Sequence, residues 1–330
     1  MAEFLTFDTD LTAVANAIRA KGGTSAQLIY PSGFVSAIQA IQTGITPKLV
    51  VTTTPGAAIT ATPAEGFKVV KGTAGADGMC TLELPKAGTW HVTAMANSVS
   101  NSQNIVIGTQ NMLLPLYHDT FADNTWEEII AVCRTGIAPD SWAVGDSKTM
   151  NIGGTAYQVD IIGKNHDEYA DGSGTAPLTF QLHDCYSEAK QMYSTNLSGL
   201  GWKNTDMRLT YLPAILALMP AEVKNGIHAV NKKTSEGGNS TTIEMVSDTL
   251  FLLSEVEIFG TASSSVSGEG SQYDYYKAGN PKIKKREGVD EFWWERSSAS
   301  GGMFCRVRAN GQAGASNASN SLGVSFAFCF

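Results

Sequence analysis

Charged side chains are scarce in this 330-residue chain, where they make up 16% of the residues, against about a quarter in an average globular protein. Gly, Ser, Thr, Ala and Asn are abundant instead, a composition common among β-rich extracellular and virion proteins. The formal net charge of −8 arises within residues 113–330, which hold 17 basic and 25 acidic side chains. Because an acidic surface repels the phosphate backbone, we expect no nucleic-acid partner.

Long apolar runs are also missing. The longest stretches, such as residues 212–219, are far shorter than the ~20 residues that cross a bilayer. The N-terminus, MAEFLTFDTD, is acidic and has no signal-peptide core. We therefore expect synthesis in the cytoplasm and no membrane insertion.

Motifs for metal, disulfide and covalent chemistry are absent from the sequence. The five cysteines form no C-x-x-C pair, which disfavours a zinc site and a disulfide framework. No G-x-S-x-G elbow, H-E-x-x-H motif or P-loop occurs. The polar stretch His166 to Glu168, with Asp171, offers ligands for calcium, but the EF-hand spacing is absent and an ordinary polar loop is the favoured interpretation. We predict no catalytic residue, no metal and no cofactor.

The stretch from Glu291 to Phe330 organises the rest of the chain. Apolar runs begin and end it, at residues 292–294 and 324–328, and Phe304 and Val307 lie between them. Small polar residues separate these runs, and from Arg296 onward there is no Asp, Glu or Lys. We predict short strands on an aromatic base, with loops of small residues on the surface. Such a face suits recognition, and the alternative is an exposed loop that binds nothing.

This stretch resembles a known family. W-W-E-R-S, then F-C-x-V and a final G-V-x-F-x-F-C, are similar to the end of a C-type-lectin-like domain of phage and prophage tail proteins of gut bacteria. They also resemble the last repeat of variable proteins diversified by phage-associated retroelements. The phrases VNKKTS, LFLLSEVEIFG and GSQYDYYKAGN extend the resemblance upstream. It implies an α+β fold, with a C-type-lectin-like ligand-binding domain over residues 112–330, in a protein made in the bacterial cytoplasm and carried in the virion.

Two further domains are expected before it. Residues 45–111 show short strand-like runs separated by turn pairs such as Pro55-Gly56 and Asp77-Gly78, which predicts an immunoglobulin-like β-sandwich spacer. Residues 1–44 show two helical patterns, too short to bury their own apolar stripes. They resemble a segment of tail-associated proteins, which implies attachment to other phage tail proteins and a homotrimer. The alternative is a helical hairpin docked on its own domain.

Local patterns within residues 112–330 predict several elements. A capping box at Asn124 and Glu127 predicts a helix, and Gly153-Gly154 predicts a hairpin turn. A second helix is expected over residues 205–218 and a strand over 251–253. The basic run 282–286 is interpreted as a solvated loop, and the tyrosines at 273, 275 and 276 as either a sugar-stacking platform or internal support.

Together these features predict a phage tail-tip or tail-fibre receptor-binding protein that presents a variable C-terminal surface to a host cell-surface protein or glycan. One alternative is an enzyme on the fold of formylglycine-generating proteins, acting on envelope glycans. That fold uses two closely spaced cysteines, whereas Cys305 and Cys329 lie far apart. The other alternative is a structural decoration of the virion.

The predicted binding residues follow from the resemblance to retroelement-diversified proteins. Such elements mutate template adenines, so Asn codons change to Ser, Gly, Ala, Asp, Tyr or Arg codons, and residues 298–321 are rich in these products. Arginine often anchors an interface and Asn adapts its hydrogen bonds. The alternative is that Arg306 and Arg308 only keep an edge strand soluble. The predicted ligand-binding set is Ser298, Ala299, Ser300, Arg306, Arg308, Asn310, Gln312, Ser316, Asn317, Ser319, Asn320 and Ser321.

Overall fold

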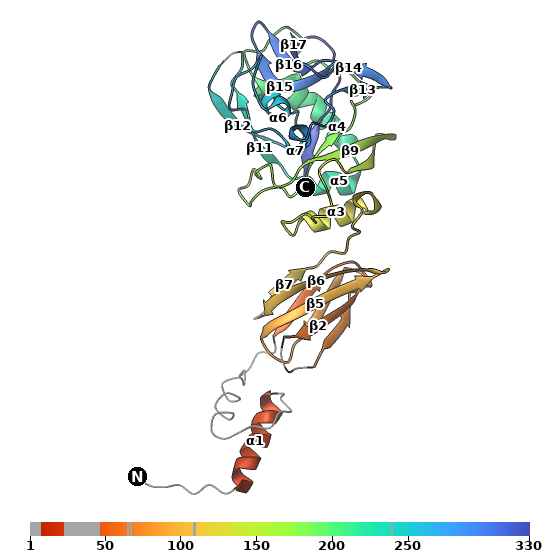
Figure 1. Cartoon of the computed structure of the whole chain (residues 1–330), viewed down its shortest axis with the longest axis vertical. Coiled ribbons are helices and arrows are strands. Elements are labelled where there is room, and N and C mark those ends of the chain that lie inside the picture. Colours follow the sequence, from red (N-terminus) through yellow and green to blue (C-terminus); the bar gives the residue numbers. More distant parts are fainter. Residues whose placement is uncertain (1–7, 23–46, 65, 67, 108–109, 239) are drawn as a thin grey trace, which may run out of the picture. The chain divides into compact units, whose positions relative to one another are not determined.

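The computed structural model describes residues 8–22, 47–64, 66, 68–107, 110–238 and 240–330 (Figure 1). The fold is mixed, with strands predominating: 37% of the chain is strand and 18% is helix. Contacts divide the chain into two compact units, Met1–Tyr117 and His118–Phe330. The mixture of helices and strands expected from the sequence is therefore confirmed.

The first unit begins with helix α1 (Asp8–Gly22), at the position of the first predicted helix. The second predicted helix lies outside the described residues. Seven strands then form two sheets, in the orders β4-β1-β7 and β3-β2-β5-β6. Only the β1–β7 pair is parallel among the paired strands of this unit. The strands are β1 (Lys48–Thr52), β2 (Ala58–Pro63), β3 (Val70–Thr73), β4 (Met79–Glu83), β5 (Gly88–Ala96), β6 (Val99–Ile107) and β7 (Gln110–Leu113).

One buried core joins these two sheets. Alternate residues point inward, so Leu49 and Val51 of β1 meet Trp90 and Val92 of β5, all of them fully buried. β3 starts at Val70. It runs through Gly72, where a Cβ atom would lie 2.4 Å from Cys80 Sγ, so only glycine lets the strand pass this close to β4.

The second unit contains short helices and four small sheets. Its elements are η1 (Phe121–Asp123), α3 (Trp126–Cys133), β8 (Ser147–Ile152), β9 (Thr155–Gly163), β10 (Thr179–Leu182), η2 (Trp202–Asn204), η3 (Met207–Tyr211), α4 (Leu212–Leu218), α5 (Ala221–Gly226), β11 (Val230–Ser235), β12 (Ile243–Asp248), α6 (Glu255–Phe259), α7 (Asp274–Lys277), β13 (Lys284–Arg286), β14 (Val289–Glu291), β15 (Trp293–Ala299), β16 (Met303–Val307), β17 (Ala313–Asn317) and β18 (Ala327–Cys329).

The sheet β18-β10-β9-β8 joins segments that are distant in the sequence. β18 pairs with β10 in the register Thr179↔Cys329. Aromatic rings hold this pairing, since Phe180 and Phe328 stack with centroids 5.2 Å apart and Phe330 meets Trp126 edge-on at 5.9 Å. Burying each such side chain contributes roughly 1.5–3 kcal/mol. The sheets β15-β16-β17, β11-β12 and β13-β14 complete the strand pairing.

Several local predictions need correction. The capping box of α3 uses Thr125 and Glu128, because the Asn124 side chain instead accepts a hydrogen bond from the His118 N–H. The expected helix over residues 205–218 is a π-helix, η3, followed by α4, with Pro213 in the first turn of α4, where its missing N–H is tolerated. Residues 251–253 form no strand beyond an isolated bridge between Phe251 and Ala327.

The basic run at residues 282–286 is also not a solvated loop. Its last three residues form β13, which pairs with β14 in a hairpin. Lys284 is buried, and its Nζ donates to the carbonyls of Leu182 and His183 at 2.6 and 2.8 Å. Burial lowers the pKa of Lys284 to about 8.

Candidate functional site

The terminal sheet consists of β15, β16 and β17, with β17 at its edge (Figure 1). Trp293 and Trp294 of β15 are fully buried, as are Phe304 and Val307 of β16. The two indoles donate to the carbonyls of Lys282 and Lys190 at 2.9 and 2.8 Å. These contacts fix the sheet on its aromatic base, so its exposed residues sit on a rigid support.

The hairpin between β16 and β17 determines which backbone groups face outward. The N–H of Arg308 donates to the carbonyl of Gln312 at 2.7 Å, so these two residues form a bonded pair. Bonded and non-bonded pairs alternate along an antiparallel ladder. The register pairs Ala313 with Val307 and Ala315 with Cys305, which places both alanines in non-bonded positions. Their N–H and C=O groups therefore point toward the outer edge of the sheet.

Two arginine side chains cross β17 and reach this outer edge. Arg306 Nε donates to Ala315 O at 3.3 Å and to Ser316 Oγ at 2.5 Å. Arg308 Nε donates to Ala313 O at 3.1 Å. The crossing is open because Gly314 separates the two alanines. The two guanidinium groups thus cap the outward carbonyls of the edge strand.

The arginines carry local positive charge within an acidic unit. Neither Arg306 nor Arg308 forms an ion pair with a described carboxylate. Burial, followed by repulsion from Arg308, lowers the pKa of the Arg306 guanidinium. Its Cζ lies 4.3 Å from the ring centroid of Phe292, which is 39% exposed. The positive charge is therefore presented beside an accessible aromatic ring.

The twelve predicted binding residues differ in their exposure to solvent. Ser298 and Ala299 are buried because every residue of β15 is covered, and Ser298 Oγ donates to Gly238 O at 3.0 Å. They do not reach the surface, so their inclusion in the binding set is wrong. Ser316, Ser319 and Arg306 are partly buried. Those exposed are Ser300, Arg308, Asn310, Gln312, Asn317, Asn320 and Ser321.

The accessible residues form two groups at opposite ends of the hairpin. At the turn, Asn310 Nδ2 donates to Gln312 Oε1 at 3.3 Å, close to the two arginines. At the other end, the N–H of Ala318 donates to Gly302 O at 3.0 Å, which brings residues 300–302 near 318–321. Ser319 Oγ there donates to Asn196 Oδ1 at 2.6 Å. Asn196 is a neighbour that the sequence did not indicate.

A buried ionic network lies beneath this unit's surface. Arg296 is fully buried and pairs with Glu257, its Nη2 lying 2.8 Å from Oε1. Lys232 bridges Asp167 and Glu257 at 2.6 and 2.7 Å. Burial alone would raise the pKa of Asp167, but the charge and hydrogen bond of Lys232 lower it to about 2. Tyr273 is also buried and donates to Asp167, so it gives internal support and is no sugar platform. Asp167 lies in a loop, as interpreted from the sequence, but its side chain is buried.

A second buried group contains an unpaired acid. Glu295 is fully buried, and neither of its carboxylate oxygens has a hydrogen-bond partner in the described part of the chain. Burial, with the nearby charges of Glu255 and Glu269, raises its pKa well above the usual value. Glu295 is therefore held in its neutral form. Among the described residues, no three His, Cys, Asp or Glu side chains are arranged to hold a metal ion.

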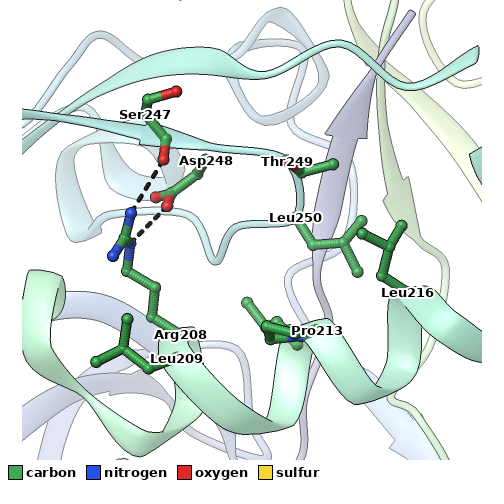
Figure 2. Close-up of a pocket in the computed structure, with 9 residues that line it drawn as sticks. Arg208, Leu209, Pro213, Leu216, Ser247, Asp248, Thr249 and Leu250 are labelled. Carbon is green, nitrogen blue, oxygen red and sulfur yellow. Dashed lines mark hydrogen bonds and ion pairs between the residues drawn. The ribbon is translucent and has the colours of Figure 1, made fainter.

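Two pockets elsewhere in this unit are less suited to bind a charged ligand than the terminal sheet. Figure 2 shows one of ≈ 230 Å³ between the η3–α4 helix and the end of β12. Arg208 reaches across it to Asp248, with Nε and Oδ1 2.6 Å apart, and to Ser247 O at 3.0 Å. Leu209 and Leu212, from the same helical stretch as Arg208, also line it, as does Leu250 from the segment after β12. A second pocket, of ≈ 290 Å³, has the Lys232 network as its floor. Arg208 and Asp248 pair in the first pocket, and Lys232 pairs with Asp167 and Glu257 in the second.

Comparison with known proteins adds one match. Residues 179–330 are similar to a family model described as a domain of unknown function, DUF6273. The matched region runs from β10 through β18 and includes the whole terminal sheet. No curated protein and no solved structure matches the chain. Within the described ranges, none of the helices combines the length and apolarity needed to span a bilayer.

Proposed function

We propose that this chain is a phage tail-tip or tail-fibre receptor-binding protein, carried in the virion after synthesis in the bacterial cytoplasm. In this proposal the His118–Phe330 unit has a C-type-lectin-like fold, and the two-sheet part of the first unit is an immunoglobulin-like spacer. Residues 1–44 attach to other tail proteins and support a homotrimer. The ligand is a protein or glycan of the host cell surface.

The observation that carries the proposal is the exposed polar turn between β16 and β17. Arg308, Asn310 and Gln312 are exposed there, above the buried residues Trp293 and Phe304. Side chains on a rigid base lose little conformational entropy when they bind a ligand. They can also change without loss of the fold, because the packing energy resides in the base. Both properties suit a surface that is diversified by a retroelement.

An enzymatic role has less support from the geometry. All five cysteines are free and buried. Burial raises the pKa of the Cys185 thiol to about 12 and that of Cys329 well above its usual value. A thiolate nucleophile is therefore disfavoured at these positions. We propose a binding protein without a cofactor.

Attachment to cells tests the proposal. The full-length chain, labelled with a fluorophore, is incubated with a panel of gut bacterial strains, and bound protein is measured by flow cytometry. We expect attachment to a subset of strains, and loss of attachment when Arg306→Ala and Arg308→Ala are combined, with the melting temperature nearly unchanged. Arg134→Ala is the matched control, since Arg134 is an exposed arginine on another part of the same unit.

Two outcomes would contradict the proposal. Attachment to no strain would favour a structural decoration. Release of sugars from a glycan array by the purified chain would favour the enzyme. If attachment persists in the double variant, the contact surface lies elsewhere on the unit.

A further inference from the structure

The outer edge of β17 carries unpaired backbone donors. Ala313 and Ala315 occupy non-bonded positions in the ladder with β16, so their N–H groups point away from the sheet. Outside the strand ladders, no hydrogen bond joins either N–H to an acceptor among the described residues. Their carbonyls, in contrast, are occupied by Arg308 and Arg306. The carbonyl of Asn317, the next outward position, accepts from the N–H of Asn320 at 2.9 Å.

This edge therefore has free N–H donors, whereas its carbonyl acceptors are already hydrogen-bonded. A peptide that adds a strand to a sheet needs both, because its own N–H groups must find carbonyls. Each N–H left unpaired in such an interface would cost about 1–3 kcal/mol. A ligand group with acceptors alone fits the edge without that penalty. Carboxylates and sulfates are acceptors of this kind.

Charge points to the same class of ligand. Arg306 and Arg308 lie on one side of β17 and form no ion pair with a described carboxylate. Nη1 of Arg306 is buried and has no hydrogen-bond partner among the described residues. From Arg296 onward the chain has no Asp, Glu or Lys, and Arg296 itself is neutralised by Glu257. The edge is thus a positive patch in an otherwise acidic unit, and guanidinium groups pair well with planar and tetrahedral oxyanions.

We propose that the edge of β17 binds an anionic group, a carboxylate or a sulfate, of an acidic polysaccharide. The guanidinium groups of Arg306 and Arg308 hold the charge, and the N–H groups of Ala313 and Ala315 complete the contact. Exposed amides of Asn310 and Gln312 lie beside the patch and suit sugar hydroxyls. This inference rests on the proposed binding surface and specifies its ligand class.

The test compares charged and neutral polysaccharides on the full chain. Polygalacturonate oligomers supply carboxylates, dextran sulfate supplies sulfates, and dextran is the neutral probe, with affinity measured by calorimetry. We expect at least one charged probe to bind and dextran not to bind. The double variant Arg306→Gln/Arg308→Gln should bind at least about tenfold more weakly, as expected for two lost charge-assisted contacts. Arg134→Gln should bind like the unsubstituted chain.

A second readout locates the contact. With alanine amides isotope-labelled, the resonances of Ala313 and Ala315 should shift on addition of the charged probe, and they should not shift in the double variant. Binding that is unchanged in the double variant, equal binding of dextran, or the absence of binding to either charged probe would overturn the inference. If poly-glutamate binds and neither charged polysaccharide does, the ligand of the edge is an acidic protein, and the proposal of an acidic polysaccharide is wrong.

Cell attachment separates this inference from the proposed function. If the double variant still attaches to cells, the anion site is wrong while the receptor-binding role stands. If the charged probe binds through the two arginines but no cell is bound, the anion site stands and the receptor-binding role fails.

Discussion

Arg308 lies across Gly314. A Cβ atom at Gly314 would come within 2.8 Å of Arg308 Nε, which donates to the carbonyl of Ala313. The absence of a side chain at Gly314 of β17 is thus what allows Arg308, directly after β16, to cap the edge. A free edge is a template for pairing with another chain, so this relationship protects the sheet.

We predict that Gly314→Ala promotes self-association. The added methyl group displaces the Arg308 side chain and uncovers the Ala313 carbonyl, so the edge gains an acceptor beside its donors. Light scattering after size-exclusion chromatography should show a larger assembly, at micromolar concentration, than the unsubstituted chain forms. Gly199→Ala is the control, because a Cβ there meets nothing within 4 Å. Equal masses for both variants would show that the arginine does not guard the edge.

A second prediction concerns the buried ionic network. Lys232→Met leaves Asp167 and Glu257 buried without their shared cation, which should cost about 3–5 kcal/mol of unfolding free energy. The control Lys233→Met, at the exposed neighbouring position, should change it by roughly 0.5 kcal/mol or less. Denaturant unfolding followed by tryptophan fluorescence reports mainly on this unit, which holds five of the six tryptophans. A loss below about 1 kcal/mol for Lys232→Met would contradict this role.

The third prediction is a pH dependence from Glu295. Its folded pKa is raised well above 4.5, chiefly by burial, so between the unfolded and the folded pKa the folded state binds up to one proton more than the unfolded state. The stabilisation from that proton is complete below the unfolded pKa and is lost as pH rises toward the folded pKa. The loss approaches about 1.4 kcal/mol per pH unit.

Glu295→Gln should remove this dependence. Between pH 5 and 8, the stability of the variant should fall less with pH than that of the unsubstituted chain. Asp167 does not interfere, because its folded pKa of about 2 confines its effect to lower pH. Glu222→Gln, an exposed position on α5, is the control. Parallel stability curves for the chain and Glu295→Gln would refute a buried neutral acid.

The fourth prediction concerns assembly. Val14 on α1 is 47% exposed, and we expect it to be covered in a homotrimer. Val14→Glu should convert the trimer to a smaller species in light scattering, because a buried unpaired carboxylate is strongly unfavourable. Ala20→Glu, exposed on the same helix, should leave the mass unchanged. A monomeric full-length chain would exclude the trimer.

Local chemistry made much of the fold predictable. Gly153-Gly154 joins β8 to β9 as expected, because consecutive glycines accept the positive φ angles of a tight turn. The base of Trp293, Trp294 and Phe304 was also predicted, since large aromatic side chains are buried wherever the fold allows. These features depend on residues that are close in sequence or on side-chain size alone.

Distant partners were not predictable in this way. Lys232 and Asp167 are 65 positions apart, and nothing in either local stretch indicates that they meet. Ser298 and Ala299 look like surface residues by size and polarity, yet neighbouring segments cover β15. Arg306 crosses β17 because of the register in which β16 pairs with β17. The sequence pattern did not predict that register. The alternative that placed Arg306 and Arg308 along an edge strand is wrong about their position, because Arg306 lies on the central strand β16 and Arg308 in the turn that follows it.

The pairing of β18 with β10 has a consequence for how this gene can vary. The aromatic residues that complete the sheet, Phe326, Phe328 and Phe330, follow the segment 298–321 in the chain. A frameshift or stop codon anywhere in that segment removes β18 and the Phe328 ring that stacks on Phe180. The sheet then cannot close, whereas substitutions that keep the frame leave it intact. Folding itself thereby acts as a filter that rejects truncated variants and retains substituted ones.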